Sequence, residues 1–272
     1  MDRLTPLLAI MFVVVGCTPV DAELAPDANP DAYVWAVGVE RPDPGEPGLD
    51  DQNPRQADTL RIVEEATVLA AVVQTTGLVA RFAPDHLIRA TEYDLVLVLD
   101  PDRPESARFS GQIPVEPLVV DDPEYRSELE GRLLELGVLD APYDDMSEDD
   151  REDVRSAMLA EGQLHAEAHP SIEVELVGVD SADDNAFPWV VTVALTVRGS
   201  RVEEPLRARM EHEDDRIRIE AFGPFRFSDL GIEPYSAVLG AVRNRDEFHL
   251  YLDLVAESAG ASGARSIRRL PD

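Results

Sequence analysis

The chain has 272 residues, of which 55 are acidic and 24 are basic, so its formal net charge is −31. All of the basic residues are arginine, because the sequence contains no lysine. A surface this negative repels nucleic acids and anionic lipid headgroups, which excludes nucleic-acid binding and adhesion to a membrane through a basic patch.

The N-terminal residues have the features expected of an export signal. Arg3 precedes an apolar run, residues 4–15, that has the length of a signal-peptide core and is too short to span a bilayer. The run ends in Val14-Val15-Gly16-Cys17, which resembles a bacterial lipobox, the motif whose cysteine is acylated and becomes the new N-terminus. Cys17 is the only cysteine in the chain and has no disulfide partner. We expect residues 1–16 to be a lipoprotein signal peptide; an ordinary secretory signal that contains a cysteine is the alternative.

Acylated Cys17 would attach the protein to a membrane, because several acyl chains bind a bilayer far more firmly than one. We therefore expect the protein in a bacterial cell envelope, lipid-anchored on the periplasmic side. Thr18, and not an aspartate, follows the cysteine, and in the familiar Gram-negative sorting pattern this favours the outer membrane over the inner.

Residues 17–57 have the composition of a tether, with seven prolines interleaved with acidic residues and glycine. Such a segment buries too little apolar surface to offset the entropy of ordering it, so we expect it to be extended and flexible. Residues 33–39 are an apolar island within it. An added strand, a plug docked on the domain, and an apolar patch in the linker all stay open as interpretations.

Beyond the tether, at residues 58–258, the hydrophobic period is mostly two residues, which predicts strands with one dry and one wet face. The inward side chains that this alternation predicts are Tyr93, Leu95, Leu97, Leu99, Ile172, Val174, Leu176, Ile217, Ile219, Phe248, Leu250, Leu252 and Leu254. Residues 67–75 and 189–197 are apolar in both alternations, which predicts strands partly covered on both faces.

A helical pair interrupts the strands. Residues 123–136 have leucines at helical spacing with Gly137 at the end, and a second helix begins after Ser147, a helix-capping residue followed by acidic side chains. We predict an all-β domain with a helical insertion at about residues 123–160, and a loose C-terminal tail at residues 259–272. Both a barrel and a sandwich fit the strands, and the helical pair favours a barrel with a covered mouth.

The sequence offers little catalytic chemistry. It has no Gly-x-Ser-x-Gly turn, no phosphate-binding glycine-rich loop and no second cysteine. His165 and His169 have the spacing of two metal ligands on a helix, but Pro170 disfavours helical geometry there and no third ligand stands nearby. Asp85 next to His86 could orient an imidazole as a base, without an implied nucleophile. We predict no catalytic residue, metal site or cofactor, and a metal-dependent hydrolase is the least supported function.

Four stretches, in order, carry a family resemblance: residues 76–88, 118–123, 193–199 and 225–236. The last contains Ser228-Asp229-Leu230-Gly231-Ile232, which resembles the Ser-Asp-Phe-Gly-Ile turn before the last strand of the YceI-like family of exported lipid-binding proteins. Ala83-Pro84 departs from the family pattern, since many relatives have Gly-His there, and the helical insertion is unusually long and acidic.

The resemblance implies an antiparallel, lipocalin-like barrel that holds an isoprenoid or similar chain in an apolar interior. We therefore expect a non-catalytic lipid carrier or buffer, with a long-chain lipid and the membrane as partners. An envelope scaffold with a filled barrel and an acidic helical insertion for a protein partner is the alternative. The sequence leaves open whether the barrel is hollow and whether two copies pair as a homodimer.

Overall fold

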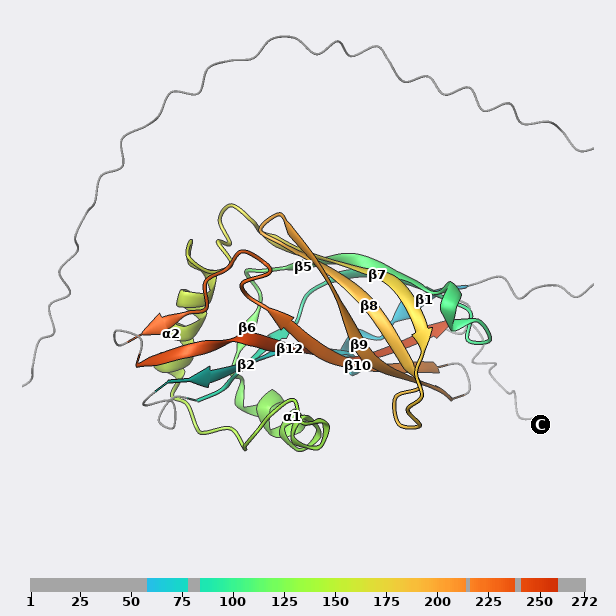
Figure 1. Ribbon diagram of the computed structural model, residues 1–272, viewed down its shortest axis with the longest axis horizontal. Helices are drawn as coiled ribbons and strands as arrows, with labels where there is room; N and C mark the ends of the chain where they lie inside the picture. Colours follow the sequence, from blue (N-terminus) through green and yellow to red (C-terminus); the bar gives the residue numbers. More distant parts are fainter. Residues whose placement is uncertain (1–57, 78–83, 214–215, 238–240, 259–272) are drawn as a thin grey trace, which may run out of the picture. The chain divides into compact units, whose positions relative to one another are not determined.

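The computed structural model describes residues 58–77, 84–213, 216–237 and 241–258 (Figure 1). The predicted signal peptide, the tether with Cys17 and its apolar island, and the tail lie outside these residues. The strands are β1 Asp58–Ile62, β2 Val68–Thr76, β3 His86–Ala90, β4 Asp94–Leu99, β5 Arg108–Pro114, β6 Val119–Val120, β7 Ser171–Ser181, β8 Trp189–Val197, β9 Ser200–Glu213, β10 Arg216–Arg226, β11 Ser236–Ala237 and β12 Val242–Ser258. The helices are α1 Pro123–Leu136 and α2 Glu148–Leu159, with 3-10 turns η1 Glu64–Ala66 and η3 Pro104–Ser106.

The strands close into an antiparallel barrel with eight strand positions, which we call lines. Three lines each consist of two strands, because β1 with β2, β3 with β4, and β5 with β6 follow each other at the same place in the sheet. The other five lines are β7, β8, β9, β10 and β12. The long strand β12 closes the ring, since it pairs with β10 on one side and with both β1 and β2 on the other. The predicted antiparallel barrel is therefore confirmed.

The three divided lines are interrupted at one level of the barrel, at residues 63–67, 91–93 and 115–118, which we call the crease. Thr67 fills a gap in the backbone pairing there. Its hydroxyl accepts a hydrogen bond from the amide of Val255 at 3.1 Å and donates one to the carbonyl of the same residue at 3.4 Å. A side chain thus takes the place of a backbone group, which keeps a buried strand satisfied where it bends.

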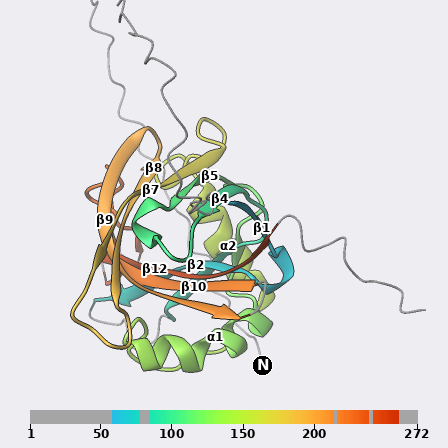
Figure 2. The same ribbon diagram turned by 90° about the vertical axis from the view of Figure 1, so that its right-hand side faces the viewer.

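Helix α1 lies on the outer wall of the barrel (Figure 2). Asp122 caps its N-terminus by accepting hydrogen bonds from the amides of Glu124 and Tyr125, and Gly137 ends it in the left-handed region at φ 69°. Its buried residues Leu129 and Leu133 pack on side chains that point outward from the sheet: Val72, Leu87, Phe222 and Tyr251. Because α1 covers the outer face of the sheet here, the parts of β2 and β10 beneath the helix are apolar on both faces.

Helix α2 is held differently. Ser147 caps it by accepting a hydrogen bond from the amide of Asp150 at 3.2 Å, but none of its residues is fully buried. The apolar side of α2 lies over the end of the barrel where β6 follows the crease, and Arg155 fixes it there by hydrogen bonds to the carbonyl and carboxylate of Glu116, at 2.5 and 3.0 Å. Both helices begin where the sequence predicted. The expectation that the pair covers the mouth is met by α2 alone, because α1 packs on the wall.

No helix in the described ranges is long and apolar enough to cross a bilayer.

Candidate ligand-binding cavity

The barrel is hollow. Its interior holds a cavity of about 440 Å³, to which all eight lines contribute side chains. The wall is almost entirely aliphatic and aromatic, and the volume is within the range of small-molecule binding sites. An apolar cavity is a poor site for water, because a buried water molecule needs several polar partners.

The structure places eleven of the thirteen predicted inward residues on the cavity wall: Leu95, Leu97, Leu99, Ile172, Val174, Leu176, Ile219, Phe248, Leu250, Leu252 and Leu254. The other two are packed elsewhere. Tyr93 lies at the crease against the cluster of Val115 and Leu118, and Ile217 is buried beside Leu60 and Leu254 without lining the cavity itself.

One part of the wall is a regular grid of nine side chains across β3, β2 and β12. The register aligns them in three rows, all facing the cavity: His86–Val73–Phe248, Ile88–Ala71–Leu250 and Ala90–Leu69–Leu252. Eight of the nine are apolar, and His86 occupies one end of the grid. Phe227 packs on Phe248 beside this end, with ring centroids 4.6 Å apart.

Further polar side chains of the wall gather at the same end as His86. They are Asp153, Gln163, Tyr235 and Asn244. Hydrogen bonds connect their segments: the Gln163 amide donates to the carbonyl of Glu233 at 3.0 Å, and the backbone amide of Asn244 donates to the carbonyl of Tyr235 at 2.9 Å. The cavity therefore has a polar end beneath α2, and Arg209 of β9 is a further polar residue of its lining.

His86 is held by a buried carboxylate. Its Nδ1 lies 2.7 Å from Oδ2 of Asp121, whose side chain is fully buried, and Oδ1 of the same group accepts a hydrogen bond from the amide of Leu87 at 2.8 Å. Arg126 lies 3.9 Å from Asp121.

Sequence reasoning paired His86 with its neighbour Asp85. In the structure Asp85 instead accepts a hydrogen bond from the amide of Thr75, because adjacent strand residues point to opposite faces.

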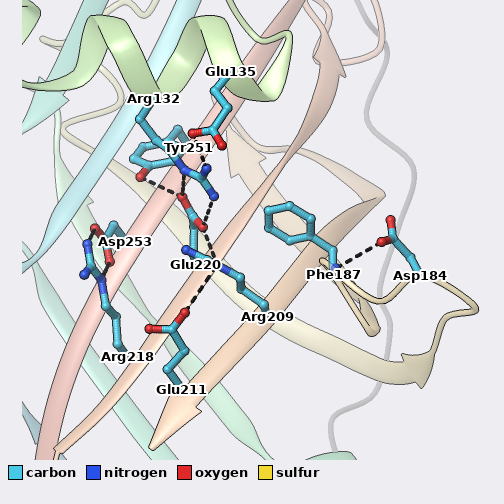
Figure 3. Close-up of polar contacts among 10 residues, drawn as sticks. All are labelled: Arg132, Glu135, Asp184, Phe187, Arg209, Glu211, Arg218, Glu220, Tyr251 and Asp253. Carbon is cyan, nitrogen blue, oxygen red and sulfur yellow. Dashed lines mark hydrogen bonds and ion pairs between the residues drawn. The ribbon is translucent and has the colours of Figure 1, made fainter. Parts of the chain in front are cut away.

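A second polar cluster lies between α1 and the barrel wall (Figure 3). Glu220 of β10, only 4% exposed, accepts two hydrogen bonds from Arg132 of α1, at 2.7 and 2.6 Å. Arg209 and the hydroxyl of Tyr251 donate to the same carboxylate at 2.7 and 3.0 Å. Burial would raise the pKa of Glu220, but these donors outweigh burial and hold its pKa below the ordinary value. The cluster attaches the helix to the barrel wall, and its members Arg209 and Tyr251 also border the cavity.

The other histidines singled out in the sequence form no site that the structure describes. His165 and His169 lie in the turns after α2 with their ring centroids 5.6 Å apart, edge to face. Within the described ranges, no group of three or more His, Cys, Asp or Glu side chains could hold a metal ion.

The fold can be compared with solved structures. BcnA of Burkholderia cenocepacia matches 72% of this chain and 99% of its own, with a TM-score of 0.50 and 12% sequence identity. The YceI protein of Campylobacter jejuni matches 63% of this chain and 84% of its own, with a TM-score of 0.44 and 12% identity. The chain has a YceI-like fold. The resemblance indicated by the sequence motifs is thus confirmed for the fold, which is what an identity this low can show. No family model matches the chain, and no curated protein is significantly similar to it in sequence.

Sequence reasoning missed Asp121, Arg132, Glu220 and the polar end of the cavity. Asp121 carried one signal, since it lies within residues 118–123, a stretch that resembles the YceI-like pattern. Glu220 carried none, because in the strand pattern it is an outward residue expected to face water. Only the packing of α1 buries it.

Proposed function

We propose that this protein is a non-catalytic carrier or buffer that holds one isoprenoid or other long-chain lipid inside its barrel. The observation that carries the proposal is the aliphatic cavity of about 440 Å³. Each methylene of a chain buried there is favourable by roughly 0.8 kcal/mol and requires no fixed geometry, so such a wall suits a flexible hydrocarbon.

The YceI-like fold and the sequence motifs support the same proposal, because the YceI-like family is one of exported lipid-binding proteins. The cavity also favours this function over the alternative of a scaffold with a filled barrel. No catalytic step is part of the proposal, because the wall presents hydrocarbon surface along most of its length and hydrogen-bonding groups at one end.

The proposal includes the membrane as a partner. The lipobox-like residues around Cys17 support an acylated anchor, and residues 17–57 are long enough to let the barrel stand away from the bilayer surface. We place the protein on the periplasmic side of a bacterial cell envelope, at the outer membrane in preference to the inner. In this arrangement a lipid would exchange between the membrane and a barrel that is confined near it.

The test uses two neighbouring residues of β4. Leu97 faces the cavity and is 3% exposed, whereas Val96 faces outward and is 49% exposed. Full-length protein is purified from a bacterial host, extracted with organic solvent, and the lipid recovered per protein is measured by mass spectrometry. We expect near-stoichiometric lipid with the wild type and Val96→Arg, and loss of lipid with Leu97→Arg.

Val96→Arg is the matched control, because it adds the same charge to the same strand without entering the cavity. Near-ultraviolet circular dichroism shows whether Leu97→Arg retains its tertiary packing. Equal lipid in all three proteins would mean that the recovered lipid is carried outside the barrel, and the proposal would then be abandoned.

A further inference from the structure

The polar end of the cavity has a built hydrogen-bonding group, and its chemistry limits which lipids fit. His86 lies at the end of the nine-residue grid, facing the same cavity as Val73 and Phe248. Its side chain is 13% exposed, so a ligand group bound there would be largely removed from water. Among the described residues, Nδ1 is hydrogen-bonded and Nε2 has no hydrogen-bond partner.

Asp121 determines which nitrogen carries the proton. A carboxylate only accepts hydrogen bonds, so the short contact of 2.7 Å requires a proton on Nδ1, and in the uncharged ring Nε2 is then the unprotonated nitrogen. Asp121 itself is fixed by backbone, since its Oδ1 accepts from the amide of Leu87 and its own amide donates to the carbonyl of Leu87, both at 2.8 Å. Asp121 has a φ of 51°, which is unusual for a residue other than glycine, and the two hydrogen bonds hold this backbone conformation in place.

In the uncharged ring with its proton on Nδ1, Nε2 carries the lone pair and is an acceptor, on a side chain that lines the cavity. We propose that Nε2 of His86 receives the hydroxyl of a long-chain alcohol, whose hydrocarbon chain lies along the apolar grid. The inference rests on the proposed lipid-binding function and names the class of lipid. An alcohol can donate to Nε2, whereas a ketone, a quinone carbonyl or an ester offers only a second acceptor and leaves the lone pair unsatisfied.

The charges at this end support an uncharged head group. Asp121 stands behind His86, and Asp153 of α2 lines the same end of the cavity. The nearest cation to Asp121 is Arg126, which is directed away from the lining: it donates to the carbonyl of Asp144 at 2.6 Å and stacks over the ring of Tyr143. A fatty acid or a prenyl phosphate would bring a further negative charge toward the buried carboxylate of Asp121, where repulsion is poorly screened by water.

Three probes with one isoprenoid chain test the assignment: farnesylacetone, the secondary alcohol obtained by reducing its carbonyl, and the hydrocarbon without either oxygen. Their affinities for delipidated full-length protein are measured by displacement of a fluorescent apolar probe. We expect the wild type to bind the alcohol about tenfold more tightly than the ketone, the scale of one hydrogen bond to a group otherwise left buried and unpaired.

Two variants separate a hydrogen bond from general packing. His86→Phe removes the acceptor, so its affinity for the alcohol should fall about tenfold to that for the ketone, while hydrocarbon binding is retained and reports an intact cavity. Asp121→Asn keeps an oxygen for the amide of Leu87 and turns its amide nitrogen toward His86, which moves the imidazole proton to Nε2. That variant should bind the ketone as tightly as the alcohol.

A shift in preference from alcohol toward ketone in Asp121→Asn cannot arise from loss of structure. Equal wild-type affinity for alcohol and ketone, or an unchanged alcohol affinity in His86→Phe, would overturn the assignment while lipid binding stands. Failure of all three probes to bind the wild type would overturn the proposed function and the assignment together.

Discussion

Arg132 of α1 and Glu220 of β10 form a two-point contact, with guanidinium nitrogens 2.7 and 2.6 Å from the two carboxylate oxygens (Figure 3). The pair joins the helical insertion to the outer wall of the barrel, 88 residues apart in the chain. Arg209 and Tyr251 complete the coordination of Glu220, so the buried charge is paired and hydrogen-bonded.

This contact predicts a large cost for Glu220→Gln. The change removes the charge that two arginines share and weakens four hydrogen bonds, so the free energy of unfolding should fall by about 2 kcal/mol. The matched control is Glu135→Gln, because Glu135 also accepts from Arg132, at 2.6 Å, but its side chain is 69% exposed. An exposed pair contributes little, and the control should cost less than about 0.5 kcal/mol. Urea unfolding followed by fluorescence measures both, and equal costs would contradict the role given to burial.

The same carboxylate predicts a pH dependence with a definite sign. The pKa of Glu220 in the folded state is lowered from its ordinary value of 4.5, so its contribution to stability is present above that pH and is lost as the pH falls through the lowered pKa. The difference in unfolding free energy between wild type and Glu220→Gln should therefore be constant from pH 7 to about pH 5 and shrink below it. A difference that grows on acidification would show that the folded-state pKa is raised.

Gly111 of β5 has no room for a side chain. A Cβ atom there would lie 2.0 Å from the carbonyl oxygen of Asp94 on the neighbouring strand. Gly111→Ala should therefore force the two strands apart and cost roughly 1–3 kcal/mol. Gly178 of β7 is the control, because a Cβ there meets no atom within 4 Å. Gly178→Ala should be neutral or slightly stabilising in the same denaturation experiment, and an equal loss at both positions would refute the steric explanation.

The net charge of −31 predicts stabilisation by salt. Mutual repulsion of the carboxylates favours the unfolded chain, and raising the ionic strength from about 0.01 to 0.5 M shortens the Debye length from about 30 Å to less than 10 Å. The melting temperature should rise over this range in sodium chloride. A neutral osmolyte at matched osmolality is the control and should reproduce little of the rise. A fall in melting temperature would mean that the surface ion pairs of the arginines outweigh the repulsion.

Acylation of Cys17 is open to a direct test. Cells that express the full-length protein and are fed a clickable palmitate analogue should label the wild type and not Cys17→Ser. The wild type should also sediment with membranes. Labelling of neither protein, together with release of a soluble mature form, would identify an ordinary secretory signal.

The class of the fold follows from the hydrophobic pattern of the sequence. Alternation with period two requires strands with one dry face, and it identified the inward side of β4, β7, β10 and β12, because a one-residue error would expose the whole apolar set. Local signals also fixed both helix starts, at Asp122-Pro123 and at Ser147, since a capping side chain acts on amides within its own turn.

The places where those helices pack, the hollow interior of the barrel and the pairing of distant polar groups could not be predicted from the sequence. The pairing of His86 with Asp121 joins residues 35 apart, and that of Arg132 with Glu220 joins residues 88 apart. Such contacts depend on the closure of the barrel and the docking of α1, and no local pattern encodes them. A hollow and a filled barrel have the same alternating sequence, because the pattern records which face is dry and not how much of the space behind it is filled.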